Sequence, residues 1–95
     1  MRIKKVDANQ KQIVQGLRKY PGISVSHTHI IGDGFPDIVV GFRGSNFLFE
    51  IKDGSKPPSA RKLTPDEEIW HNKWAGQIEI VKNIDEILNL MDYPF

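Results

Sequence analysis

Two short apolar runs, residues 38–42 and 47–51, constrain the fold of this chain more than any other feature. Both are rich in β-branched and aromatic side chains, and the connecting residues 43–46 are mostly polar and include a glycine. Apolar runs joined in this way are typical of a β-hairpin. We therefore predict a hairpin with a symmetric turn, in which Phe42 faces Phe47 and the two strands pair along their length.

Alternation along these strands separates an apolar face from a charged one. Successive side chains point to opposite faces of a sheet, so the apolar positions of both runs share one face, which must be core. The same counting sets Val39 opposite Glu50 and Asp37 opposite Lys52, with both acids and the lysine on the other face. Opposed Cβ atoms lie about 5 Å apart and diagonal neighbours about 7–8 Å, so one divalent ion can bridge the two carboxylates.

The charged face has a simple structural interpretation and a chemical one. Singly, Asp37 is compatible with a residue that starts a strand, and Glu50 with Lys52 is compatible with a same-face pair on an edge strand. However, an ionised Glu50 among apolar strand neighbours is costly unless it is paired or bound to metal. The three residues together favour a metal-dependent phosphodiesterase, whose chemistry uses acids to hold the cation and a lysine beside the reacting groups.

The remaining elements follow from capping residues and strand patterns. Asp7 with Gln10 resembles a helix start, and Thr64 before Pro65 with Glu67 is a stronger one. The predicted order is αβββαβα, and its β–α–β connection favours a parallel partner for the last strand, hence an α/β fold with a mixed sheet flanked by helices. The predicted elements are a helix over residues 7–19, a strand over 23–31, the hairpin, a helix over 64–75, a strand over 77–82, and a helix from 83 or 85 to 91.

Length and composition narrow the class of protein. A chain of 95 residues with 39% hydrophobic residues suits one globular domain, 1–95, whose small core makes an oligomer a reasonable expectation. The absence of cysteine excludes a disulfide scaffold and a thiolate zinc site, and it suits a reducing cytoplasm. No apolar stretch approaches the ~20 residues of a membrane span, so we expect a soluble, intracellular protein without a membrane partner.

Several strings of the sequence resemble the VRR-NUC nucleases, a family of the PD-(D/E)xK superfamily. They are residues 7–10 (DANQ), 32–41 (GDGFPDIVVG), 49–54 (FEIKDG) and 62–67 (KLTPDE), followed by Trp70 and His71. This resemblance to the minimal phage and bacterial type covers nearly the whole chain. It implies a restriction-endonuclease-like αβββαβ fold and a DNA endonuclease that uses Mg²⁺ or Mn²⁺. It further implies a homodimer that prefers branched DNA such as Holliday junctions.

The resemblance also implies roles for single residues. Asp37 and Glu50 become metal ligands, and the carbonyl of Ile51 is offered as a third. Lys52 then orients or activates the attacking water, or stabilises charge on the phosphate; the residues are compatible with either role. The family's acidic position on the first helix falls near Asp7, which serves equally well as an N-cap.

Two further positions are candidates for the same site. Gln10 lies on the helical face that carries the apolar stripe of the first helix, so it can reach the site in place of Asp7. Relatives usually carry glutamine on the second helix where this chain has glutamate. We expect Glu67 to be occupied by capping, which makes Glu68 the better candidate.

The net charge is only +1, but the basic residues are clustered. A local basic patch is what phosphate binding requires, although solvated charge explains the same clusters equally well. The alternative function is a non-catalytic nucleic-acid-binding or dimerisation module that retains the nuclease fold. His27 and His29 lack a third ligand for zinc, and we expect Trp70 and Trp74 to be core or dimer contacts. The candidate DNA contacts are Lys4, Lys5, Lys56, Ser59, Arg61 and Lys62.

Overall fold

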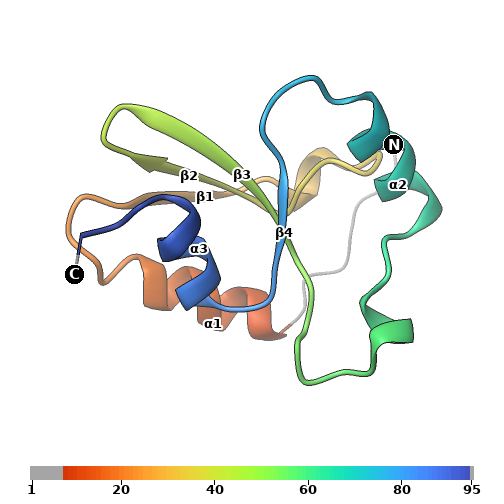
Figure 1. Cartoon of the computed structure of the whole chain (residues 1–95), viewed down its shortest axis with the longest axis horizontal. Coiled ribbons are helices and arrows are strands. Elements are labelled where there is room, and N and C mark those ends of the chain that lie inside the picture. The colour runs from red at the N-terminus through yellow and green to blue at the C-terminus, as the bar shows by residue number, and fades with distance from the viewer. Residues whose placement is uncertain (1–7, 95) are drawn as a thin grey trace.

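The computed structural model describes residues 8–94, which form a four-stranded sheet with three α-helices (Figure 1). Strands β1, β2 and β3 are antiparallel neighbours and β4 runs parallel to β3, so the expected element order and the mixed α/β sheet are confirmed. The elements are α1 (Ala8–Leu17), β1 (Ser24–His27), η1 (a 3₁₀ turn, His29–Ile31), β2 (Ile38–Phe42), β3 (Ser45–Ile51), η2 (a 3₁₀ turn, Pro58–Arg61), α2 (Pro65–Lys73), β4 (Glu79–Val81) and α3 (Ile84–Leu90).

The hairpin turn is shorter than predicted. β3 begins at Ser45, so the turn consists of Arg43 and Gly44, whose φ angles are 52° and 78°. Positive φ at both residues gives a tight turn whose twist matches that of antiparallel strands. Phe42 therefore pairs with Ser45, and the predicted partner Phe47 is wrong by two residues. Because the shift is even, every side chain keeps its predicted face.

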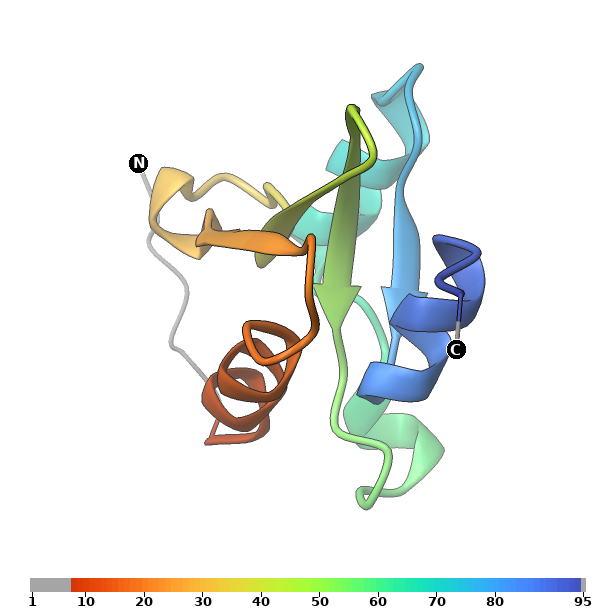
Figure 2. The same ribbon diagram turned by 90° about the vertical axis from the view of Figure 1, so that its left-hand side faces the viewer.

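The core lies on one side of the sheet. Figures 1 and 2 show α1 and α3 on this side and α2 on the other. Full burial of a valine, leucine, isoleucine or phenylalanine stabilises a fold by about 1.5–3 kcal/mol, and this cluster supplies most such burial in the described chain. Its members are Ile13, Val14, Leu17, Val25, Ile38, Val40, Phe42, Phe49, Ile51, Val81, Ile87, Leu88 and Met91.

The first strand ends earlier than predicted. Thr28 and His29 donate their N–H groups to the carbonyl oxygen of Asp37, at 2.8 and 3.1 Å. The chain then turns into η1, so residues 29–31 are not strand. The two hydrogen bonds to Asp37 thus anchor the segment after β1 to the residue that precedes β2.

The helix on the opposite side of the sheet is positioned by close contacts with the loop before β2. Gly34 has a φ of 86°, and a Cβ at this position would overlap the carbonyl oxygen of Asp66, so only glycine allows this approach. Beside it, the ring of Phe35 packs edge-on to Trp70 with centroids 5.1 Å apart. Thr64 forms the predicted capping box at the start of α2. No helix within residues 8–94 has both the length and the apolar character needed to cross a membrane.

The short strand β4 leaves part of β3 without a strand neighbour, and a side chain takes its place. Oε1 of Gln77 lies 2.6 Å from the N–H of Leu48 and accepts from it, while Nε2 donates to the carbonyl of Leu48 at 3.0 Å. These two bonds reproduce what an adjacent strand residue would provide. The Gln77 amide therefore covers the edge of β3 at Leu48, the residue just before the segment that pairs with β4.

Candidate active site

Asp37 is held in place through its backbone and its side chain. Its N–H donates to the carbonyl of Phe49 at 3.1 Å, and its own carbonyl accepts the two bonds from the segment after β1. Its Oδ2 accepts the N–H of Ile51 at 2.8 Å, which ties the carboxylate directly to β3. Asp37 is only 5% exposed. The acid is therefore fixed relative to β3 before any ligand is bound.

Glu50 lies in the central strand β3 and is 1% exposed. The observed register pairs Ile38 with Phe49, so its continuation by one residue sets Asp37 opposite Glu50. The predicted pairs Val39–Glu50 and Asp37–Lys52 are accordingly wrong, but the two acids become directly opposed. This brings the carboxylates closer than the predicted diagonal arrangement, since opposed Cβ atoms lie about 5 Å apart.

Lys52 stands between two buried acids. Its Nζ donates to Oε1 of Glu67 at 2.8 Å and lies 3.8 Å from Oε2 of Glu50. Its own N–H donates to the carbonyl of Val81 at 2.9 Å, so the backbone is held in the parallel ladder. The Lys52 side chain is 15% exposed. The ammonium group is therefore oriented by Glu67 and still reaches the surface.

Glu67, not Glu68, joins this cluster. Glu67 is 3% exposed, whereas Glu68 is exposed on the outer side of α2. Oε1 of Glu67 accepts both from Lys52 Nζ and from the N–H of Thr64, the latter at 2.9 Å. The Glu67 carboxylate therefore caps α2 and binds Lys52 at the same time. The sequence pattern set Glu67 aside because of its capping role and favoured Glu68. A capping-box glutamate points back toward the chain that enters the helix, and this signal could have identified Glu67.

The carbonyl of Ile51 is directed toward Asp37. In a strand the N–H and C=O of one residue point to the same side, and the N–H of Ile51 reaches the Asp37 carboxylate. The carbonyl at this position consequently faces the same side of β3 as that acid. This orientation is compatible with the implied role of a third metal ligand.

Gln10 contacts histidines in place of the acidic pair. It is 2% exposed, and its Nε2 lies 3.1 Å from Nδ1 of His27 and 3.4 Å from Nδ1 of His29. Burial lowers the pKa of His27, as do the charges of His29 and of nearby basic side chains. A neutral His27 can accept a hydrogen bond from the Gln10 amide. The structure thus places Gln10 in a polar contact between α1 and the end of β1.

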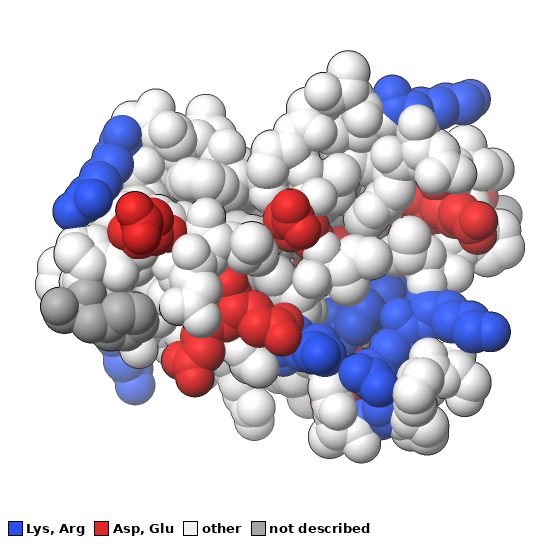
Figure 3. Space-filling model, viewed as in Figure 1, with Lys and Arg blue, Asp and Glu red and all other residues white. Residues whose placement is uncertain are grey.

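Most of the candidate DNA contacts lie on one surface. The loop after β3 and η2 carries Lys56, Arg61 and Lys62, which we call the basic loop, and Ser59 lies among them. Figure 3 shows Lys and Arg side chains gathered over this part of the molecule. Lys4 and Lys5, like Asp7, lie outside the described residues.

The residues fit a hydrated divalent cation. Carboxylate oxygens are the ligands that Mg²⁺ prefers, and it usually keeps several waters and binds through one or two carboxylates together with substrate phosphate. Among residues 8–94 no group of three acidic or histidine side chains forms a complete protein-only metal cage. Asp37 and Glu50, with the carbonyl of Ile51, would instead hold a cation that remains open to water and phosphate.

Three acids of the described residues, Asp37, Glu50 and Glu67, are buried in this cluster, and Lys52 lies beside Glu50 and Glu67. Comparisons with models of protein families, with curated proteins and with solved structures find no match. The site is therefore interpreted from its own geometry.

Proposed function

We propose that this protein is a divalent-metal-dependent DNA endonuclease with a restriction-endonuclease-like core, related to the VRR-NUC family. The observation that carries the proposal is the pairing of two buried acids, Asp37 and Glu50, with Lys52 held beside them by Glu67. A protein that only binds nucleic acid has no need for buried carboxylates beside phosphate. A phosphodiesterase needs both the acids and the lysine.

Each residue has a role that its geometry supports. Asp37 and Glu50 would hold Mg²⁺ or Mn²⁺, which when bound polarises the scissile phosphate and lowers the pKa of a bound water. Lys52 presents its ammonium group at the same place, where it can donate to the attacking water or to a phosphate oxygen. Glu67 acts through Lys52, since its Oε1 accepts from Nζ at 2.8 Å. The basic loop would bind the flanking phosphates.

The dimer and the preference for branched DNA are part of the same proposal. They rest on the family resemblance and on exposed apolar side chains of η1, of α2 and of the α2 C-cap, which a second copy of the chain could cover. A two-fold dimer would present two metal sites to symmetry-related strands, as paired nicks across a four-way junction require. The exposed side chains are Ile30, Ile31, Ile69 and Trp74, which are 60%, 45%, 54% and 42% exposed.

The test is a cleavage assay on labelled linear, flapped and four-way-junction DNA with Mg²⁺, with Mn²⁺ and with EDTA. We expect cleavage only with a divalent cation, and faster cleavage of the junction than of linear duplex. Light scattering on the same sample should show a dimer. Cleavage that persists undiminished in EDTA refutes the metal mechanism. Metal-independent DNA binding without any cleavage supports the non-catalytic module instead.

A further inference from the structure

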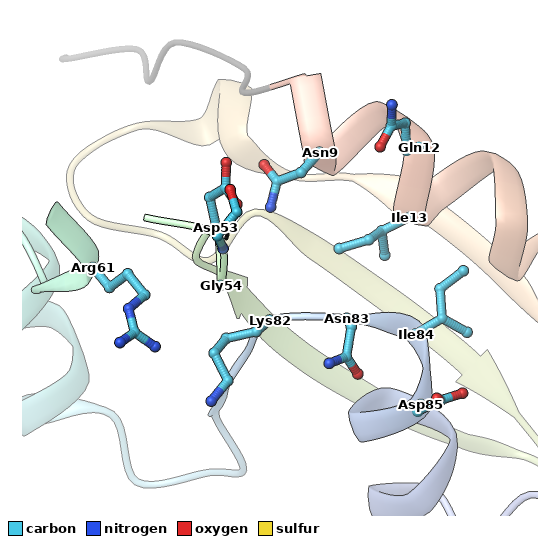
Figure 4. Close-up of a pocket in the computed structure, with 11 residues that line it drawn as sticks. Asn9, Gln12, Ile13, Asp53, Gly54, Arg61, Lys82, Asn83, Ile84 and Asp85 are labelled. Carbon is cyan, nitrogen blue, oxygen red and sulfur yellow. Dashed lines mark hydrogen bonds between the residues drawn. The ribbon is translucent and has the colours of Figure 1, made fainter. Parts of the chain in front are cut away.

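A pocket of about 620 Å³ lies beyond the end of β3 (Figure 4). It is formed by the start of α1, the loop after β3, the end of η2 and the connection between β4 and α3. Its residues Asp53 and Gly54 directly follow Lys52 in the chain. The volume is within the roughly 300–1,000 Å³ range of small-molecule sites.

Two polar side chains that line this pocket have no hydrogen-bond partner in the described part of the chain. Both Nδ2 and Oδ1 of Asn9 are shielded from solvent and unpaired, and so is Nε of Arg61. Leaving a buried polar group unpaired costs about 1–3 kcal/mol, and such groups in native proteins usually have a partner. These covered atoms belong to residues that line the pocket, so a ligand can pair with them once it displaces the atoms that cover them.

The lining residues are arranged by character. Figure 4 shows Arg61 and Lys82 at one side of the pocket, Ile13 and Ile84 at the other, and Asn9 between them. A ligand that matches this order has an anionic end, an edge with a donor and an acceptor, and flat apolar faces. A nucleotide has all three in this order, as phosphate, base edge and base faces.

The acids of the pocket are compatible with an anionic ligand. Oδ1 of Asp53 accepts the N–H of Ser55 at 2.9 Å and its hydroxyl at 2.6 Å. This carboxylate is thus hydrogen-bonded inside its own loop. Asp85 lies beside Ile84, away from Arg61 (Figure 4). Lys82 Nζ is 3.7 Å from a carboxylate oxygen of Glu86, which leaves Arg61 as the better candidate to contact an anion.

We propose that this pocket binds one nucleotide, with the phosphate on Arg61 and the base edge on the Asn9 amide. An asparagine amide pairs with adenine through N6 and N7, using one donor and one acceptor, so adenine should be preferred. The inference rests on the proposed function insofar as the nucleotide belongs to a bound DNA strand. A free mononucleotide has the same chemistry, and the experiment below distinguishes the two sources.

The test is an NMR titration of the ¹⁵N-labelled full-length chain in EDTA with dAMP, with inorganic phosphate and with a short oligo(dA). We expect dAMP to shift the side-chain amide signals of Asn9, and inorganic phosphate to leave them in place. Asn9→Ala should weaken dAMP binding about tenfold, because a bidentate asparagine–adenine pair contributes about 1–3 kcal/mol. The matched control is Asn89→Ala, an exposed asparagine of α3 outside the pocket, which should bind dAMP as the wild type does.

The three titrations and the cleavage assay can fail independently, so they test the pocket and the proposed function separately. Oligo(dA) that binds at least tenfold more tightly than dAMP assigns the nucleotide to a strand, and equal affinity assigns it to a free mononucleotide. Unmoved Asn9 signals, or wild-type affinity in Asn9→Ala, overturn the pocket inference even if the protein cuts DNA. If the protein cuts no DNA but dAMP moves the Asn9 signals, the pocket stands and the nuclease proposal fails.

Discussion

Replacing Glu67 with glutamine should slow DNA cleavage far more than the same replacement at Glu68. Glu67 holds the ammonium group of Lys52 at 2.8 Å, whereas its neighbour Glu68 is exposed. Glutamine keeps an oxygen that can accept from Lys52 but removes the negative charge, and this weakens the bond by about 1–1.5 kcal/mol, the difference between a bond to a charged group and an ordinary one. If that amount of Lys52 positioning is lost in the transition state, kcat falls about five- to tenfold, at about 1.36 kcal/mol per factor of ten.

The same position also predicts a stability effect that does not depend on the proposed activity. Glutamine retains an oxygen that can accept the N–H of Thr64, so the helix cap should survive in Glu67→Gln. Alanine removes the reciprocal bond from the Thr64 N–H, about 0.5–1.5 kcal/mol, and the bond to Lys52, about 1.5–3 kcal/mol, while the Thr64 hydroxyl still accepts the backbone N–H of residue 67. With a fall in Tm of about 4–8 °C per kcal/mol for a domain of this size, Glu67→Ala should unfold at least about 8 °C below wild type.

The assay is steady-state cleavage of a labelled four-way junction at saturating and limiting substrate, read beside thermal unfolding by circular dichroism. A positioning role predicts a lower kcat for Glu67→Gln with little change in KM, in a protein that remains folded at the assay temperature. Glu68→Gln is the matched control and should be close to wild type. Equal rates for the two glutamine variants would refute the role assigned to Glu67.

Three further outcomes are expected. Asp37→Asn should abolish cleavage yet retain or strengthen DNA binding in EDTA, because a metal ligand and a negative charge are lost together; retained turnover would mean that the site is assigned wrongly. Alanine replacement of the basic loop should flatten the salt dependence of DNA binding by roughly 0.9 log units per lost phosphate contact, while Arg43→Ala at the hairpin turn should not; an unchanged slope would move the DNA surface elsewhere. As pH falls below 6.5, the ordinary pKa of histidine, the free energy of unfolding should fall, because the lowered pKa of His27 makes the unfolded chain take up the proton first. His27→Gln should reduce this fall between pH 6.5 and the lowered pKa in urea unfolding, and an unaltered pH dependence would contradict it.

The hairpin shows which part of the fold was predictable from sequence. Apolar alternation determines the face of each side chain, and the faces of Asp37, Glu50 and Lys52 follow from it. The length of the turn decides the partners across the strands, and it depends on whether Arg43 adopts a positive φ angle, as it does here at 52°. Most residues other than glycine avoid that conformation, so a longer turn was the natural expectation from the sequence.

The candidate site shows the limits of local patterns in another way. Helical periodicity sets Gln10 on the face of the apolar stripe, and the residue is buried there, but its partners lie 17 and 19 residues away in the chain. Such contacts depend on where β1 ends, and that is decided by backbone bonds to Asp37. The choice between Glu67 and Glu68 similarly depends on the side of α2 that faces the sheet. Gly34 decides this through its close approach to the start of α2.

The side chain of Gln77 has a consequence for the behaviour of the protein in concentrated solution. An uncovered sheet edge is a template on which strands of other molecules can add. At Leu48 both backbone groups are already occupied by the Gln77 amide, so an incoming strand would first have to displace two hydrogen bonds. A single side chain thus protects the edge of the central hairpin strand against intermolecular strand addition, where β4 is too short to do so.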